Sequence, residues 1–143
     1  MHPSLTNLPN ILKKFPLIQA AYIFGSIASG KERKDSDLDL GIFPRSPEIR
    51  NQRLDILQEL AKEGFSNVDL VFLDTDNIVL KYEAIRQNKL IYCTEDFDRG
   101  STYSLIVRQY LDFLPFLKTQ RQAYKRKILD GQTRSNHETP SKT

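Results

Sequence analysis

The sequence predicts an α/β or α+β domain, in which a small mixed β-sheet is flanked by helices. Four short apolar runs have the length and composition of strands, and they lie at residues 20–24, 38–43, 68–73 and 90–93. Stretches with apolar residues at helical spacing lie between these runs and after the last of them. The length of 143 residues suits one compact domain and is short for two.

The first clear helix is expected between the second and third strands. A Ser-Pro pair at 46–47 places a cap residue before a proline at the first helical position, and Gly64 supplies the stop. Within this window Leu54, Leu57 and Ala61 fall on one helical face. We therefore expect these three residues to form the apolar side of the helix.

Two further helices are expected toward the C-terminus. Thr75 can cap a helix whose apolar residues recur at helical spacing: Ile78, Tyr82 and Ile85. After Ser101 a longer helical pattern follows, which Pro115 is expected to kink or divide. The long helix carries more apolar surface than a small domain needs, which suggests an interface.

Composition excludes several classes of protein. Hydrophobic residues make up 39% and charged residues 27%, which excludes a disordered chain, and no apolar run approaches the length of a membrane span. The single cysteine, Cys93, excludes an internal disulfide framework and a multi-cysteine zinc site, and we expect it to be a small buried residue. Residues 1–10 show no secretory signal, so we expect a cytoplasmic protein without a membrane partner.

The net charge of +3 is unevenly distributed along the chain. Residues 118–143 hold seven basic and two acidic residues, a net charge of +5, whereas residues 1–117 hold 14 basic and 16 acidic residues. A basic tail suggests an anionic partner, although Lys and Arg also favour helix C-termini, where they would simply be solvated. We expect no direct binding of nucleic acid.

The stretch between the first two expected strands can be interpreted as a phosphate site in two ways. Gly25 and the Gly30-Lys31 pair have the spacing of a P-loop, but Glu32 stands where Ser or Thr would hold magnesium. A P-loop also opens directly into a full helix, whereas the next strand begins near Asp37, about six residues after Lys31. The P-loop interpretation is therefore disfavoured.

A set of acidic residues supports the second interpretation. Asp37 and Asp39 are two apart at the entry of a strand, so their side chains share one face. Paired carboxylates on a half-buried strand repel each other, and a hard cation such as magnesium relieves that repulsion. Asp69 has the matching phase in the next strand and would reach the same metals if the two strands are neighbours. Gly25 and Ser26 would form a turn that holds a phosphate.

The pair Gly25-Ser26, ten intervening residues and then Asp37-Leu38-Asp39 resemble the signature of the nucleotidyltransferase superfamily related to DNA polymerase β. A third acid on a following strand belongs to that signature, and Asp69 stands where it is expected. The short chain and its closing helix, residues 110–117, look like the minimal nucleotidyltransferase (MNT) antitoxins. The resemblance extends to about residue 129, which predicts a nucleotidyltransferase domain over residues 1–130 and a polar tail over residues 131–143.

The resemblance implies a function and a set of roles. An MNT antitoxin transfers AMP from ATP to a tyrosine of a cognate HEPN-domain RNase toxin and so neutralises it. Asp37, Asp39 and Asp69 would hold two Mg²⁺ ions, with Asp69 also positioning or deprotonating the incoming hydroxyl. Gly25 and Ser26 would hold the triphosphate of ATP.

Two other functions stay open on the sequence. The chain could be a binding module that neutralises its partner by contact alone, although such a module has no physical need for three clustered acids. It could also be a small-molecule nucleotidyltransferase of the antibiotic-modifying kind, whose active site would have the same residues. The absence of an acceptor domain disfavours the latter, because the acceptor pocket would then have to come from a second chain.

Overall fold

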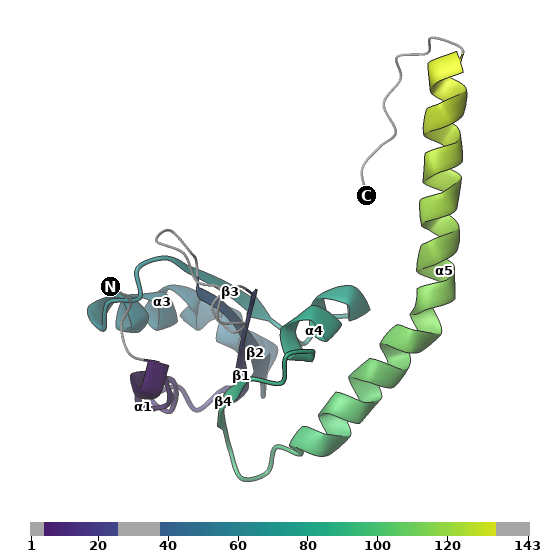
Figure 1. The fold of residues 1–143 in the computed structure, drawn as a ribbon. Helices are drawn as coiled ribbons and strands as arrows, with labels where there is room; N and C mark the ends of the chain where they lie inside the picture. The colour runs from purple at the N-terminus through teal and green to yellow at the C-terminus, as the bar shows by residue number, and fades with distance from the viewer. Residues whose placement is uncertain (1–4, 26–37, 134–143) are drawn as a thin grey trace. The chain divides into compact units, whose positions relative to one another are not determined.

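The computed structural model describes residues 5–25 and 38–133, and it contains one four-stranded sheet in the order β3-β2-β1-β4 (Figure 1). The strands are β1 Ile18–Phe24, β2 Leu38–Pro44, β3 Val68–Phe72 and β4 Leu90–Cys93. Strand β1 runs antiparallel to both β2 and β4, whereas β2 and β3 are parallel. The predicted mixed sheet is confirmed, and its four strands lie where the apolar runs placed them.

Helices lie before, between and after the strands. Their bounds are η1 Leu5–Asn7, α1 Leu8–Leu12, η2 Pro47–Gln52, α3 Arg53–Lys62, α4 Ile78–Ile85 and α5 Arg99–Thr133, where η marks a 3₁₀ helix. The parallel pair β2 and β3 is joined by a crossover that contains η2 and α3. Among the described residues, no helix is long and apolar enough to cross a membrane.

The sheet has a buried cluster on each face. One cluster joins the sheet to α1 and α3, and it includes Leu8, Leu12, Leu38, Leu40, Ile42, Ile56 and Leu60. The other joins the sheet to α4 and the first turns of α5, and it includes Tyr22, Leu73, Ala84, Ile85 and Ile106. Alternate residues of β2 therefore belong to different faces, as the period of a strand requires.

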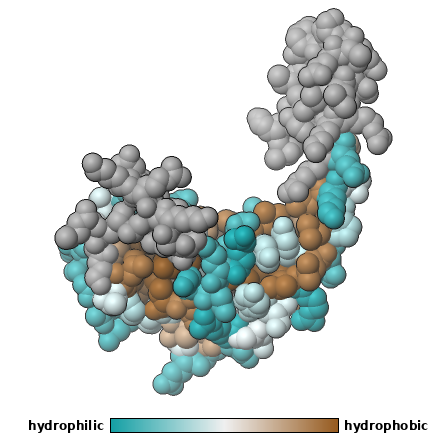
Figure 2. All heavy atoms as spheres, in the orientation of Figure 1, coloured by the Kyte–Doolittle hydropathy of each residue, from teal (hydrophilic) through white to brown (hydrophobic). Residues whose placement is uncertain are grey.

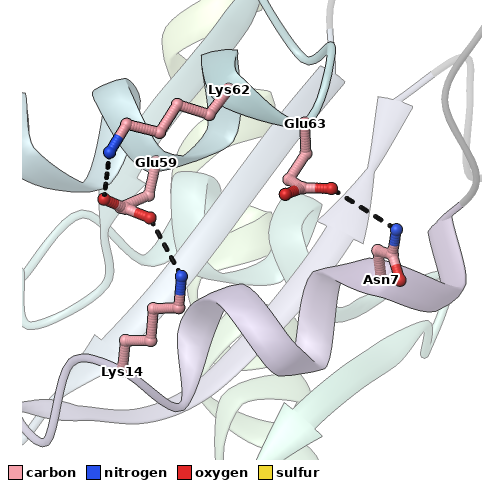
Figure 3. Close-up of polar contacts among 5 residues, drawn as sticks. All are labelled: Asn7, Lys14, Glu59, Lys62 and Glu63. Atoms are coloured by element: carbon pink, nitrogen blue, oxygen red, sulfur yellow. Dashed lines mark hydrogen bonds and ion pairs between the residues drawn. The ribbon is translucent and has the colours of Figure 1, made fainter.

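Polar contacts at the surface connect the two flanks of α1 to α3 and its C-cap (Figure 3). The Glu59 carboxylate accepts from Lys14 Nζ and from Lys62 Nζ, each at 3.1 Å. Asn7 Nδ2 donates to Glu63 Oε1 at a longer 3.5 Å. These groups are exposed, so the buried apolar cluster beneath them contributes most of the stability of this helix pair.

The helix after β2 begins and ends where the sequence predicts, but it buries a different face. Ser46 Oγ accepts from Glu48 N at 3.3 Å, and Gly64 follows the helix with a φ of 98°. Of the predicted apolar face, Leu57 is confirmed, since it is partly buried against the cluster under the sheet. Leu54 is 73% exposed and Ala61 is exposed, so the prediction is wrong for these two, and the buried residues are Ile49, Ile56 and Leu60. The segment has a second set of apolar residues at helical spacing, Ile49, Ile56 and Leu60, and this second face is the one that packs under the sheet.

The cap of the next helix, α4, lies two residues after the predicted cap. Its cap is Asn77, whose Oδ1 accepts from Leu80 N at 3.1 Å, and the predicted cap Thr75 instead accepts from Asn77 N at 3.2 Å. Ile85 is buried and Ile78 and Tyr82 pack against the same cluster, so the predicted apolar face of α4 is confirmed.

Helix α5 is continuous through Pro115, so this proline does not divide it, and a kink at Pro115 stays a prediction. Proline lacks one N–H and removes one hydrogen bond, which a helix of 35 residues tolerates. The chain separates into two compact units at another point of this helix, residues 1–107 and residues 108–143.

Cys93 is exposed instead of buried, because it ends the edge strand β4, in which no residue is fully buried.

Candidate active site

The sheet brings one glycine and two aspartates from three strands to the same place. Asp39 on β2 is the register partner of Asp69 on β3 and of Phe24 on β1, the residue before Gly25. Register partners on adjacent strands lie on the same face, about 5 Å apart between backbones. The expectation that the strands of Asp39 and Asp69 are neighbours is therefore met.

The two carboxylates lie on the α4 side of the sheet, beyond the end of the buried cluster. Leu38 and Leu40, which flank Asp39 in the sequence, point into the opposite cluster under α1 and α3. Two residues along the strand, Gly41 faces Leu73 and Ala84 on the same side as Asp39. Asp39 is half-buried and Asp69 is exposed, so a ligand can approach this pair from solvent.

Gly25 is packed directly against the carboxylate of Asp39. A Cβ built on Gly25 would overlap Asp39 Oδ2 and would lie 3.1 Å from Asp39 Cγ. The φ of Gly25 is 81°, in the left-handed region that side chains rarely adopt. Both facts require glycine at this position, and they leave the backbone in contact with the acid.

The backbone of Gly25 is held by a residue that the sequence analysis missed. Gly25 N–H donates to Gln87 Oε1 at 3.0 Å, a contact between residues 62 apart in the chain. Gln87 follows α4, and no spacing or motif in the sequence relates it to Gly25. The antiparallel pairing of β1 with β4 and the packing of α4 on β1 bring the two segments together.

Aromatic side chains fill the same face of the sheet nearby. The ring of Tyr22 meets Phe43 and Phe97 edge to face, at centroid distances of 5.9 and 6.5 Å. Burial raises the pKa of Tyr22, and its hydroxyl has no hydrogen-bond partner among the described residues. Tyr22 therefore packs within an aromatic group on this face of the sheet.

The remaining predicted site residues, Ser26 and Asp37, lie outside the described residues, as does the Gly30-Lys31 part of the disfavoured P-loop. Among the described residues no group of three His, Cys, Asp or Glu comes together. Asp39 and Asp69 nevertheless supply carboxylate oxygens from adjacent strands, which are the ligands that Mg²⁺ prefers. Of the three acids expected to hold Mg²⁺, the two that lie among the described residues, Asp39 and Asp69, are therefore suitably placed to bind it.

Carboxylates on adjacent strands beside a tight glycine turn are an arrangement suited to metal-assisted transfer of phosphoryl or nucleotidyl groups. Residues 6–97 match the family model described as Polymerase beta, Nucleotidyltransferase. This match covers more than half of the chain, and the chain belongs to that family.

Individual relatives agree with the family. The chain is 29% identical over 108 residues to a protein of Shewanella oneidensis named Protein adenylyltransferase MntA, covering 76% of this chain and 74% of the relative. It is 25% identical to a chain in the crystal structure of a toxin-antitoxin with AMP-PNP, with a TM-score of 0.68 over 88% of this chain and 98% of the other.

A third similarity concerns the fold alone. The structure described as tri-AMPylated Shewanella oneidensis HEPN toxin in complex with MNT antitoxin contains a chain 24% identical to this one. The TM-score is 0.62, and the match covers 87% of this chain and 95% of the other.

Proposed function

We propose that the chain is the antitoxin of a toxin–antitoxin pair and transfers AMP from ATP to a tyrosine of a cognate HEPN-type RNase toxin. The observation that carries the catalytic part is the register of Asp39 with Asp69, with Gly25 packed on Asp39. The similarity to an adenylyltransferase and to a toxin–antitoxin complex with an ATP analogue supports the choice of nucleotide and partner.

The proposed reaction is an in-line displacement at the α-phosphorus of ATP. The tyrosine oxygen of the partner forms a bond to this phosphorus, and the bond from the phosphorus to the bridging oxygen breaks, so pyrophosphate leaves. Two Mg²⁺ ions, when bound, stabilise the charge on the attacking and leaving oxygens.

The proposed site residues hold the metals, the tyrosine hydroxyl and the triphosphate. Asp37 and Asp39 hold the metals, and Asp69 completes one metal site from the neighbouring strand. Asp69 is exposed and also positions the tyrosine hydroxyl or accepts its proton. The turn of Gly25 and Ser26 holds the triphosphate through the Ser26 hydroxyl and the Ser26 backbone N–H, because the Gly25 N–H itself donates to Gln87.

The acceptor is proposed to come from the partner protein, and helix α5 offers the surface that would bind it. In residues 108–120 of α5, Leu111 is 55% exposed and Phe116 is 53% exposed, and the rings of Phe113 and Phe116 pack at 5.4 Å. Apolar side chains are visible along this part of the helix (Figure 2). Exposed aromatic and leucine side chains supply binding energy at protein interfaces, while the basic residues after 117 would mainly steer the encounter.

The test is the mass of the partner toxin after incubation with the purified chain, ATP and Mg²⁺. We expect a gain of one or more AMP units on tyrosine, and no gain when EDTA replaces Mg²⁺. A toxin that is neutralised without any gain in mass would replace this proposal by neutralisation through contact alone. Transfer of AMP to an aminoglycoside-like small molecule, with the toxin unmodified, would instead indicate an antibiotic-modifying enzyme.

A further inference from the structure

The contact that holds Gly25 comes from a loop outside the sequence motif of the family. Residues 86–89 connect α4 to β4, and Gln87 in this loop accepts the Gly25 N–H at 3.0 Å. Gly25 is also the residue whose backbone packs on the carboxylate of Asp39. The side chain of Gln87 therefore acts on the acid through one glycine.

The loop that carries Gln87 is fixed on both sides. Asn88 has a φ of 58°, and its N–H donates to Ile85 O at 2.8 Å. Arg99 Nη2 donates to Asn88 O at 2.8 Å and to Asn88 Oδ1 at 3.1 Å. On the other side, Lys89 O accepts from Ile23 N at 3.1 Å. Gln87 is thus presented to Gly25 by a backbone that is itself hydrogen-bonded to α4, α5 and β1.

We propose that Gln87 is a positioning residue for nucleotidyl transfer, which sets the place of Asp39 in the metal site by holding Gly25 against it. This inference rests on the proposed function, because only the proposed function gives Asp39 a metal to bind. The physical requirement is a hydrogen-bond acceptor at the end of the residue 87 side chain. A side chain of equal length without an acceptor leaves the Gly25 N–H unpaired, and the turn then loses the contact that fixes it.

Two variants test the acceptor at residue 87. Gln87→Met keeps the length of the side chain and removes the acceptor. Gln58→Met makes the same chemical change at an exposed position of α3, the helix that packs on the opposite face of the sheet. Calorimetry with AMP-PNP, in Mg²⁺ and in EDTA, measures the metal-dependent part of nucleotide affinity for each protein.

We expect Gln87→Met to raise the Kd of AMP-PNP in Mg²⁺ about tenfold, the size of one lost hydrogen bond, and to leave the Kd in EDTA unchanged. Gln58→Met should stay close to the wild-type Kd. Equal affinity of Gln87→Met and wild type in Mg²⁺, or an equal loss in Gln87→Met and Gln58→Met, overturns the inference while the proposed function stands. A wild-type chain that shows no Mg²⁺-dependent binding of AMP-PNP overturns the proposed function itself.

Amide hydrogen exchange gives a second readout that does not depend on any variant being well folded. The Gly25 amide of the wild-type chain should exchange slowly compared with an unstructured glycine, since it is hydrogen-bonded. In Gln87→Met it should exchange faster, while amides of α3 keep their protection. An unprotected Gly25 amide in the folded wild-type chain would contradict the inference directly.

Discussion

At the scale of single residues, Gly25 is the motif position at which the structure most clearly requires the residue that the sequence has. The sequence predicts a glycine turn at the end of β1 and an acid at position 39, but not that the two touch. Periodicity reports which face a strand residue is on, and it does not report the approach of one backbone to a side chain. For the same reason Gln87 could not be found from the sequence, because its contact with Gly25 exists only after the sheet is formed.

Gly25→Ala should damage both the fold and the site. The new Cβ meets the Asp39 carboxylate and the backbone has a positive φ, so we expect a loss of about 1–3 kcal/mol in the free energy of unfolding and a loss of Mg²⁺-dependent ATP binding. Gly100→Ala is the matched control, because its Cβ would meet only Asp98 Oδ1 at an ordinary 3.8 Å. Urea unfolding of both variants is the measurement, and a harmless Gly25→Ala would contradict the packing described here.

The ion pair of Arg45 and Asp96 predicts how stability depends on pH. Two hydrogen bonds of 2.8 Å from Arg45, helped by the Thr94 hydroxyl, hold the pKa of Asp96 well below its usual range. A carboxyl whose pKa is lowered in the folded state stabilises the fold above its unfolded pKa, near 4, and loses that contribution as the pH falls further. Asp96→Asn should therefore lose less stability than wild type between about pH 4 and pH 2 in urea unfolding. Identical pH profiles would show that this exposed pair contributes nothing.

At the scale of elements, strands were more predictable than helix faces. The four apolar runs stand out because each is short and bounded by polar or turn residues, and each became a strand. The helix after β2 has apolar residues at 54, 56, 57, 60 and 61, which cover more than one face. The choice between those faces depends on which of them meets the sheet, and periodicity alone does not show that.

Two leucines of α3 test which face of this helix is buried. Leu60 is fully buried in the cluster under the sheet, so Leu60→Ala should lower the free energy of unfolding by about 2–5 kcal/mol. Leu54 is 73% exposed, so Leu54→Ala should change it by no more than about 0.5 kcal/mol. Chemical denaturation of the pair compares the same substitution on two faces of one helix. The reverse order of effects would restore the face predicted from the sequence.

At the scale of the whole molecule, the family and the mixed sheet were predictable because a short motif with fixed spacing sits between recognisable strands. The boundary of the nucleotidyltransferase domain at residue 130 stays a prediction. Ser26 and Asp37 stay predictions as site residues as well, since they lie outside the described residues. The partner is not encoded in any local pattern, and its identity is proposed from similarity to other proteins.

Truncation after Leu117 tests whether ATP binds to the part of the chain before the cut while residues 118–143 promote association with the toxin. All proposed metal and nucleotide ligands precede residue 70, and Gln87 and Arg99 also precede the cut, so Mg²⁺-dependent binding of ATP should be unchanged. The truncated chain lacks the +5 charge of residues 118–143, so its association with the toxin should be slower and less dependent on salt. Stopped-flow association at two salt concentrations measures this. A truncated chain that no longer binds ATP would contradict the placement of the site.

The most direct test of whether Asp39 and Asp69 carry the transfer of AMP is the rate at which AMP appears on the toxin in a single turnover, followed by intact mass. Asp39→Asn and Asp69→Asn should each slow this transfer about 100-fold or more while leaving the fold intact, because they remove carboxylate ligands and not packing. Asp76→Asn, at an exposed position just before α4, should transfer AMP at the wild-type rate. Transfer by Asp39→Asn at the wild-type rate, or neutralisation of the toxin by both site variants with no AMP attached, would contradict the claim.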